Sequence, residues 1–438
     1  MATSIAFRIS RAGAPGWLSA PYRLLIRTSL FLALAAGFSI GLYLVVGFAL
    51  GVPMAASTPA LIQVHGQVQA LGFVALFIMA VGVQLFPRFH STRLEQPAQV
   101  SLGGLLLALG IVLRLVGQPL LPPAPLRPAI VVGSGVLELV GVLLAVQAFA
   151  KVVRGGVQPA PGGWRALLPA TMATSLLLAL LLNLYACLQL ADGPLVVPFA
   201  QDEALTHLQL WGFASSMVLA VSGRIYPRFL LLRPTRDGLL KIALSMWAVG
   251  SLGLPIVWLT AAEVPLLRAA AALAQLLGAA LFVVGLRLYE PPVRQSGMPH
   301  VTTPTRRWAR AAYALLLAAC AADFGAALAE ASGVPISVTR LSAARHLLAQ
   351  GFLMTVIIYM AARILPGYSG YMMHKPRLLA GLVWTVLVGA VLRGGAELTG
   401  GYAPGWGGVV ALGGTLGVAA FVVFAVGLWR TTSQAPGS

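Results

Sequence analysis

The chain has 438 residues, of which 59% are hydrophobic and only 9% are charged, and its mean hydropathy is +0.89. This composition excludes an ordinary soluble globular protein, in which charged residues are far more frequent. The formal net charge of +18 would suit a nucleic-acid-binding protein, but the basic residues are concentrated between long apolar stretches. The two cysteines, Cys187 and Cys320, fall inside such stretches, where we expect small core residues and no disulfide.

Apolar stretches about 20 residues long, the length that crosses a bilayer core, recur along the whole chain. We predict twelve transmembrane helices, at residues 23–50, 60–87, 98–118, 128–150, 166–190, 204–227, 239–261, 265–287, 308–331, 341–366, 377–399 and 406–429. The predicted fold is therefore an all-α integral membrane protein with a single membrane domain over residues 1–438.

The basic residues predict the orientation of these helices. With a cytoplasmic N-terminus, the inner segments carry 21 lysines and arginines, whereas the outer segments carry three, Arg127, Arg340 and Arg345. Such an excess on the inner side places both termini in the cytoplasm. Attraction to the anionic inner leaflet is then a sufficient explanation of the charge, so the expected partner is the lipid bilayer and not nucleic acid.

One pattern occurs three times, and each copy runs from a histidine through a Gly-Phe pair to a proline. The copies are His65, Gly72, Phe73 and Pro87; His207, Gly212, Phe213 and Pro227; and His346, Gly351, Phe352 and Pro366. The interval from the Gly-Phe pair to the proline is the same in all three. We predict three pseudo-symmetric four-helix repeats, at residues 23–155, 165–295 and 306–430, in which these prolines end helices at the inner surface.

Several ionisable residues fall within the predicted outer half of the membrane. An ionisable residue in hydrocarbon costs several kcal/mol unless it is paired, which makes it a functional candidate. Arg114 and Arg393 each lie 27 residues after a repeat proline. Two interpretations stay open: the arginines form internal ion pairs, Arg114 with Glu138 and Arg393 with Glu397 or Asp323, or they face an anionic ligand group.

The three repeated histidines, His65, His207 and His346, also fall in this outer half. A neutral imidazole facing the interior of a helix bundle is a common ligand of heme iron and of copper. A single such histidine is more often a packing residue, but three at equivalent places favour ligation by at least two. His90, His300 and His374 lie in or beside cytoplasmic loops, where we expect them to be solvated.

Three motifs carry a family resemblance. They are Val64-His65-Gly66-Gln67-Val68-Gln69, Gly223-Arg224-Ile225-Tyr226-Pro227 and His346-Leu347-Leu348-Ala349-Gln350-Gly351. These motifs resemble those of the NnrS family, twelve-span bacterial membrane proteins that contain heme and copper and belong to the nitric oxide stress response. Gln67 and Tyr368 stand where the family has histidines. The chain is more distantly similar to subunit I of the heme-copper oxidases, which carries histidines on spans two, six and ten.

The resemblance implies a bacterial inner-membrane protein that handles nitric oxide, or does related redox chemistry, near the periplasmic face. By similarity, His65 and His346 would be the axial ligands of a heme, and His207 would lie on the side where copper is held. Arg114 and Arg393 would neutralise the heme carboxylates, and Gln67, Gln69 and Glu138 would hold the ligands in place. The implied partners are a small diatomic ligand and an electron donor or respiratory complex.

Two other functions stay open at this point. The first is a cofactor-free channel or transporter, in which the intramembrane charges line a path for an anion or for protons. The second is a structural or assembly subunit of a respiratory complex.

Overall fold

A computed structural model describes residues 20–122, 124–157, 163–261, 264–293, 299–369 and 376–433. These residues form helices and their connections, with no β-strand among them. Twelve helical rods in this part of the chain are long and apolar enough to cross a membrane, and they coincide one for one with the predicted spans. The prediction of an all-α multi-pass membrane protein is confirmed.

The rods are built from α-helices (α) and π-helical segments (η). In chain order they are α1 (Pro21–Leu32), η1 (Ala33–Phe38) and α2 (Ser39–Ala49); α3 (Thr58–Gln67), η2 (Val68–Ala75) and α4 (Leu76–Phe89); α5 (Pro97–Leu115) and η3 (Val116–Leu120); α6 (Leu126–Gly155); α7 (Trp164–Ala191); α8 (Phe199–His207), η4 (Leu208–Ser215) and α9 (Ser216–Phe229); α10 (Asp237–Thr260); α11 (Pro265–Leu286); α12 (Pro299–Ala331); α13 (Val338–His346), η5 (Leu347–Met354) and α14 (Thr355–Ser369); α15 (Pro376–Thr399); and α16 (Gly407–Ser433).

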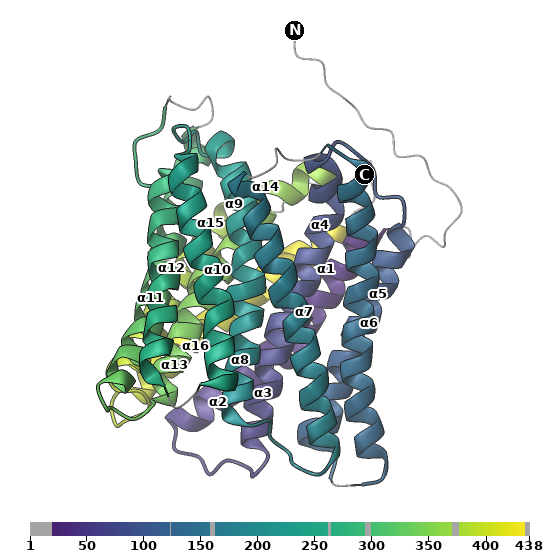
Figure 1. Cartoon of the computed structure of the whole chain (residues 1–438), viewed down its shortest axis with the longest axis vertical. Helices are drawn as coiled ribbons and strands as arrows, with labels where there is room; N and C mark the ends of the chain where they lie inside the picture. Colours follow the sequence, from purple (N-terminus) through teal and green to yellow (C-terminus); the bar gives the residue numbers. More distant parts are fainter. Residues whose placement is uncertain are drawn as a thin grey trace.

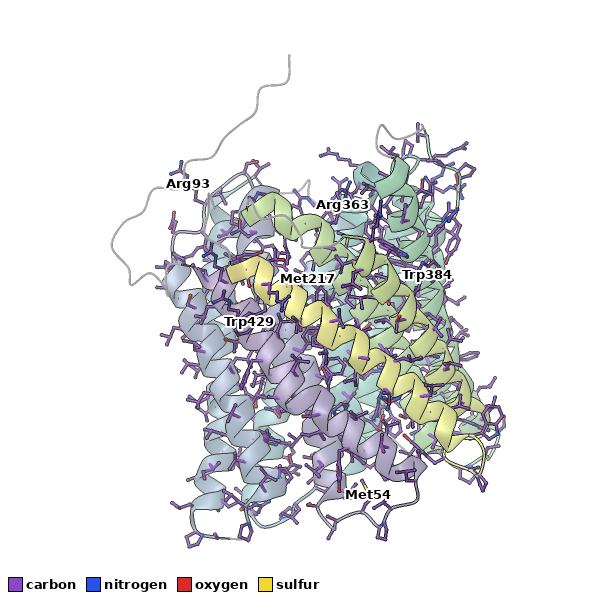
Figure 2. All side chains as sticks on the ribbon, turned by 180° about the vertical axis from the view of Figure 1, so that it is seen from behind. Met54, Arg93, Met217, Arg363, Trp384 and Trp429 are labelled. Atoms are coloured by element: carbon purple, nitrogen blue, oxygen red, sulfur yellow. The ribbon has the colours of Figure 1, made fainter. Side chains whose placement is uncertain are left out.

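The rods stand side by side in one bundle (Figure 1). The segments that carry the repeated histidines, α3, α8 and α13, lie at one end of it, and α4, α9 and α14 lie at the other. Seen from behind, α16 crosses the bundle obliquely and packs on α2 (Figure 2).

Three helix pairs, α5 with α6, α10 with α11 and α15 with α16, pack along each other on glycines. A Cβ added to Gly103 would lie 2.4 Å from the carbonyl oxygen of Gly141, and one added to Gly278 would lie 2.5 Å from the Trp247 nitrogen. A Cβ on Gly389 would lie 2.7 Å from the carbonyl oxygen of Gly413. Small residues let helices in a membrane approach this closely, where dispersion forces hold them together.

The three long central rods share a π-helical segment at the same place. The segments η2, η4 and η5 each have 8 residues. The fifth residue of each is the glycine of the repeated Gly-Phe pair, and η4 contacts both η2 and η5. Isolated π-helical turns are rare and occur most often at functional sites. The residues that immediately precede them are Gln67, His207 and His346.

The repeat prolines do not end their helices, so that prediction was wrong. α4 continues two residues past Pro87, and α9 continues two residues past Pro227. A proline in the last turn removes only one N–H donor, and the later N–H groups still bond to carbonyl oxygens one turn back. The helices end just beyond, where Ser91 and Leu231 take positive φ angles of 50° and 55°.

The ends of these rods are linked by a repeated arginine–aromatic contact. Arg224 on α9 lies 4.4 Å from the centre of the Phe89 ring on α4, and Arg363 on α14 lies 4.9 Å from that of Phe229 on α9. Arg363 is labelled in Figure 2 at this end of the bundle. Each arginine lies three residues before a repeat proline, and each phenylalanine lies two residues after the preceding one. The same contact therefore joins α9 to α4 and α14 to α9.

Candidate functional site

His65 lies near the end of α3 and packs against two glycines of the first rod. Its Nδ1 is 2.8 Å from the carbonyl oxygen of Gly37. A Cβ added to Gly41 would lie only 2.6 Å from its Cε1, so this ring needs a glycine there. Gln69, one turn further on, occupies the space beside Gly37. The contacts fix the orientation of the ring with Nδ1 turned toward the first rod.

His346, the last residue of α13, is fixed in a comparable way. Its Nδ1 is 2.8 Å from the carbonyl oxygen of Ser342 and 3.2 Å from Oε2 of the buried Glu397 on α15. Arg393 Nε donates to the other carboxylate oxygen of Glu397 at 3.2 Å. The ion pair between Arg393 and Glu397, one of the two interpretations of these charges, is present.

We call His65, His346 and Arg393 one cluster, since His65 lies within electrostatic range of the other two. In both imidazoles the hydrogen-bonded nitrogen is Nδ1, and within the described part of the chain Nε2 has no hydrogen-bond partner. A histidine that ligates a metal through Nε2 is usually oriented by such a bond at Nδ1. Two imidazoles held in this way have the donor chemistry that heme iron takes, so His65 and His346 are the residues that would hold the group.

Gln67 and Glu138 form a second, separate cluster. Gln67 donates to Glu138 Oε2 at 2.6 Å, and Asn183 donates to the same oxygen at 3.0 Å. Gln209 on η4 donates to the amide oxygen of Gln67 at 2.8 Å. The network links α3, α6, α7 and η4, and all four side chains are buried.

Arg114 belongs to this second cluster. Its hydrogen bonds run to Gln118 at 2.7 Å, to Asn183 at 3.3 Å and to the sulfur of Cys187. Asn183 therefore connects Arg114 with Glu138 and stands in place of the direct ion pair considered from the sequence. Of the residues expected around a heme, His65, His346 and Arg393 lie in the first cluster, and Gln69 lies beside Gly37, whose carbonyl His65 also contacts. Arg114, Gln67 and Glu138 lie in the other network.

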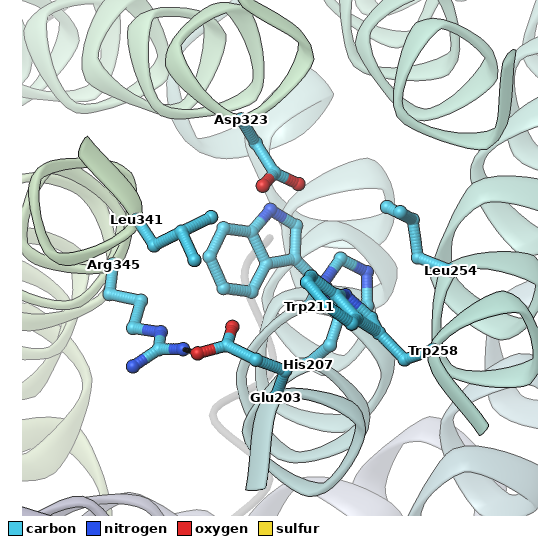
Figure 3. A pocket seen from close by; sticks show the side chains of 8 residues that line it. All are labelled: Glu203, His207, Trp211, Leu254, Trp258, Asp323, Leu341 and Arg345. Carbon is cyan, nitrogen blue, oxygen red and sulfur yellow. Dashed lines mark ion pairs between the residues drawn. The ribbon is translucent and has the colours of Figure 1, made fainter. Parts of the chain in front are cut away.

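His207 lies in a third place, in a pocket that also contains Asp323 and an ion pair between Arg345 and Glu203 (Figure 3). Its ring stacks on Trp211, with ring centres 4.8 Å apart and an angle of 5° between the planes. The buried Nε2 has no hydrogen-bond partner, although Gln275 is nearby.

Sequence reasoning did not select Glu203, Trp211 or Arg345. A signal was available for two of them, since Glu203 precedes His207 by four residues and Trp211 follows it by four. This spacing puts the three side chains on one helix face. Arg345 is beside His346 in sequence, but its contact with Glu203 joins two helices and has no local signal.

The surroundings of His207 do not fit a copper ion. Within the described ranges, no three His, Cys, Asp or Glu side chains are grouped so that they could hold a metal, and the pocket contains no second histidine or cysteine. Copper sites need imidazole or sulfur ligands in combination. Of the histidines expected to be solvated, His90 is half-buried and bonds to the Val157 carbonyl. The His300 side chain and the whole of His374 lie outside the described residues.

Comparison with known proteins agrees with this architecture. The sequence profile of the NnrS protein family matches residues 16–435, which contain all twelve membrane-spanning rods and both histidines of the pair. No curated protein sequence matches the chain. Because the profile covers nearly the whole length, the chain belongs to the NnrS family.

Proposed function

We propose that this membrane protein of the NnrS family binds heme through His65 and His346 and serves the nitric oxide response by redox chemistry. The main support for the proposal is that the two imidazoles have the same hydrogen-bonding pattern. Each is hydrogen-bonded at Nδ1, and neither has a partner at Nε2 among the described residues. Family membership fits a role in the nitric oxide response. When bound, the heme supplies an iron that exchanges electrons, and the protein sets the reduction potential of that iron.

The residues beside the two ligands have distinct tasks in this proposal. Glu397 and the Gly37 carbonyl orient His346 and His65, and a carboxylate at Nδ1 makes an imidazole the stronger electron donor. Arg393 pairs with Glu397 and supplies positive charge next to the two histidines. Gly41 leaves room for the His65 ring. Copper is not part of the proposal, since no described group fits it.

We further propose that the twelve rods form three repeats, residues 23–155, 165–295 and 306–430, with both termini in the cytoplasm of a bacterium. Support comes from the π-helical segments in register, the glycine-packed pairs and the repeated arginine–phenylalanine contact. The excess of basic residues between the spans supports the orientation. The His65–His346 cluster then lies toward the periplasmic face.

The test is the reduced-minus-oxidised absorption spectrum of the purified protein, with His65→Ala and His346→Ala measured beside it. We expect a heme spectrum in the wild type and its loss in both variants. His207→Ala and His90→Ala are matched controls, because both residues lie outside the cluster, and both should keep the spectrum. A folded wild type that stays colourless after reconstitution with heme would refute the proposal and favour a cofactor-free transporter.

A further inference from the structure

Two neighbouring cavities lie beside His207. The inner cavity, shown in Figure 3, is lined by His207, Trp211, Glu203 and Arg345. The outer cavity is lined by Arg268, Glu330, Arg340 and the Pro335–Ser337 segment that connects α12 to α13. Leu254, Trp258, Asp323 and Leu341 line both, so the cavities are adjacent and Asp323 stands at their junction.

The inner cavity is surrounded by polar atoms without partners. His207 and Trp211 are 6% and 3% exposed, and neither His207 Nε2 nor Trp211 Nε1 makes a hydrogen bond of good geometry, although Gln275 lies near the first and the Cys320 thiol near the second. The Asp323 carboxylate accepts no hydrogen bond from any described residue and forms no ion pair with one, although it faces the cavity (Figure 3). Asp323 is half-buried, whereas the His207 and Trp211 nitrogens are buried, and leaving a buried polar group dry costs about 1–3 kcal/mol. The cavity therefore requires an occupant that both donates and accepts hydrogen bonds.

The size of the cavities decides what that occupant is. Each has a volume of about 20 Å³. A single water occupies roughly 10–15 Å³, the volume of one water-sized sphere, so each cavity has room for water. Water also meets the chemical requirement, because it donates to Asp323 and to His207 Nε2 and accepts from the Trp211 indole.

The other carboxylates beside the cavities are paired with arginines, so Asp323 is the one that can exchange a proton. Arg345 and Glu203, from α13 and α8, neutralise each other, and so do Arg268 and Glu330, from α11 and α12. Arg340 lies at the outer cavity, and the Cys320 thiol is near Asp323 on α12. Asp323 thus lies between two ion pairs whose charges cancel, with space for water in the inner and the outer cavity.

We propose that the two cavities form a hydrated proton path that runs from the α12–α13 connection, past Asp323, to the interior beside His207 and Trp211. A proton passes from a hydrated proton in the outer cavity to the Asp323 carboxylate, and the carboxylic acid then gives it to a water in the inner cavity. No electron moves, and Asp323 returns to its ionised form. The path is independent of heme binding.

The experiment is infrared spectroscopy of the full-length protein in liposomes during a pH titration and during exchange from H2O to D2O. We expect a carboxylic acid band from Asp323 that appears on acidification, shifts at once in D2O and is lost in Asp323→Asn. Asp323→Glu should keep such a band. Glu138→Gln identifies the band of Glu138, a buried carboxyl that lines neither cavity and should exchange much more slowly.

A blocking variant tests the route separately. Ala327 is buried and lines the outer cavity, so Ala327→Phe fills that space while Asp323 stays in place. We expect the Asp323 band to remain and its deuterium exchange to slow markedly. The proposal is overturned if no titrating band depends on Asp323, if that band exchanges no faster than the Glu138 band, or if Ala327→Phe leaves the exchange rate unchanged.

Discussion

The ion pair between Arg393 and Glu397 allows a quantitative prediction. Its atoms are 3.2 Å apart, and the two side chains are 13% and 0% exposed. Arg393→Met keeps most of the side-chain volume but leaves a buried carboxylate without its cation. Breaking a buried ion pair on one side costs about 3–5 kcal/mol, so we expect destabilisation of about 3 kcal/mol, roughly a hundredfold change in the unfolding equilibrium.

Glu397→Gln should cost less, about 1–2 kcal/mol, because an amide can still hydrogen-bond to His346 and the longer Arg393 can turn toward water. The double variant should then be more stable than the sum of the single losses predicts, by about 1–2 kcal/mol, since the uncompensated carboxylate is gone. The assay is denaturant unfolding of heme-free protein in detergent, with Arg363→Met, a half-buried arginine in contact with Phe229, as the control. Strictly additive losses would refute this account of the pair.

Two further predictions concern the heme ligand and a loop. Gly41→Ala should displace the His65 ring and weaken the heme spectrum of a folded protein. Gly66→Ala is the control, because a Cβ added at Gly66 has no other atom within 4 Å, and it should leave the spectrum unchanged. Equal spectra of the two variants would contradict the packing argument. Glu290 lies between two spans, and its hydrogen bond with Arg287 lowers the pKa of its carboxyl. The stabilisation that the Arg287–Glu290 pair contributes should therefore be complete at neutral pH and be lost as the pH falls through that lowered pKa. The melting temperatures of the wild type and of Glu290→Gln should then converge in acid.

The sequence was sufficient to predict the twelve spans, because their hydropathy alone requires a membrane. It also selected His65, His346 and Arg393, which the structure brings together, since an ionisable side chain in a bilayer is costly and therefore conspicuous. The pairing of Arg393 with Glu397 follows from a spacing of four residues, one turn of a helix.

Contacts between helices could not be predicted from the spacing of residues along the sequence. Arg114 and Glu138 lie on sequential spans and suggested a direct pair, but Asn183, 45 residues after Glu138, lies between them. The π-helical segments have no propensity signal of their own, since they arise where a helix takes up an extra residue under tertiary packing. The prediction that α4 ends at Pro87 failed because it applied a local rule where that rule is weak. Proline disrupts the interior of a helix but has little effect in its last turn.

Gln67 shows why the first copy of the pattern differs from the other two. It occupies the position that His207 and His346 hold, immediately before a π-helical segment. From there it donates to Glu138 and accepts from Gln209, two contacts that an amide satisfies together through its separate donor and acceptor atoms. His65, two residues earlier and on nearly the opposite face of the helix, turns instead to Gly37 and the His346 cluster. Gln67 thus serves as a polar link between α3, α6 and η4, whereas the imidazoles of His65 and His346 are held by separate contacts.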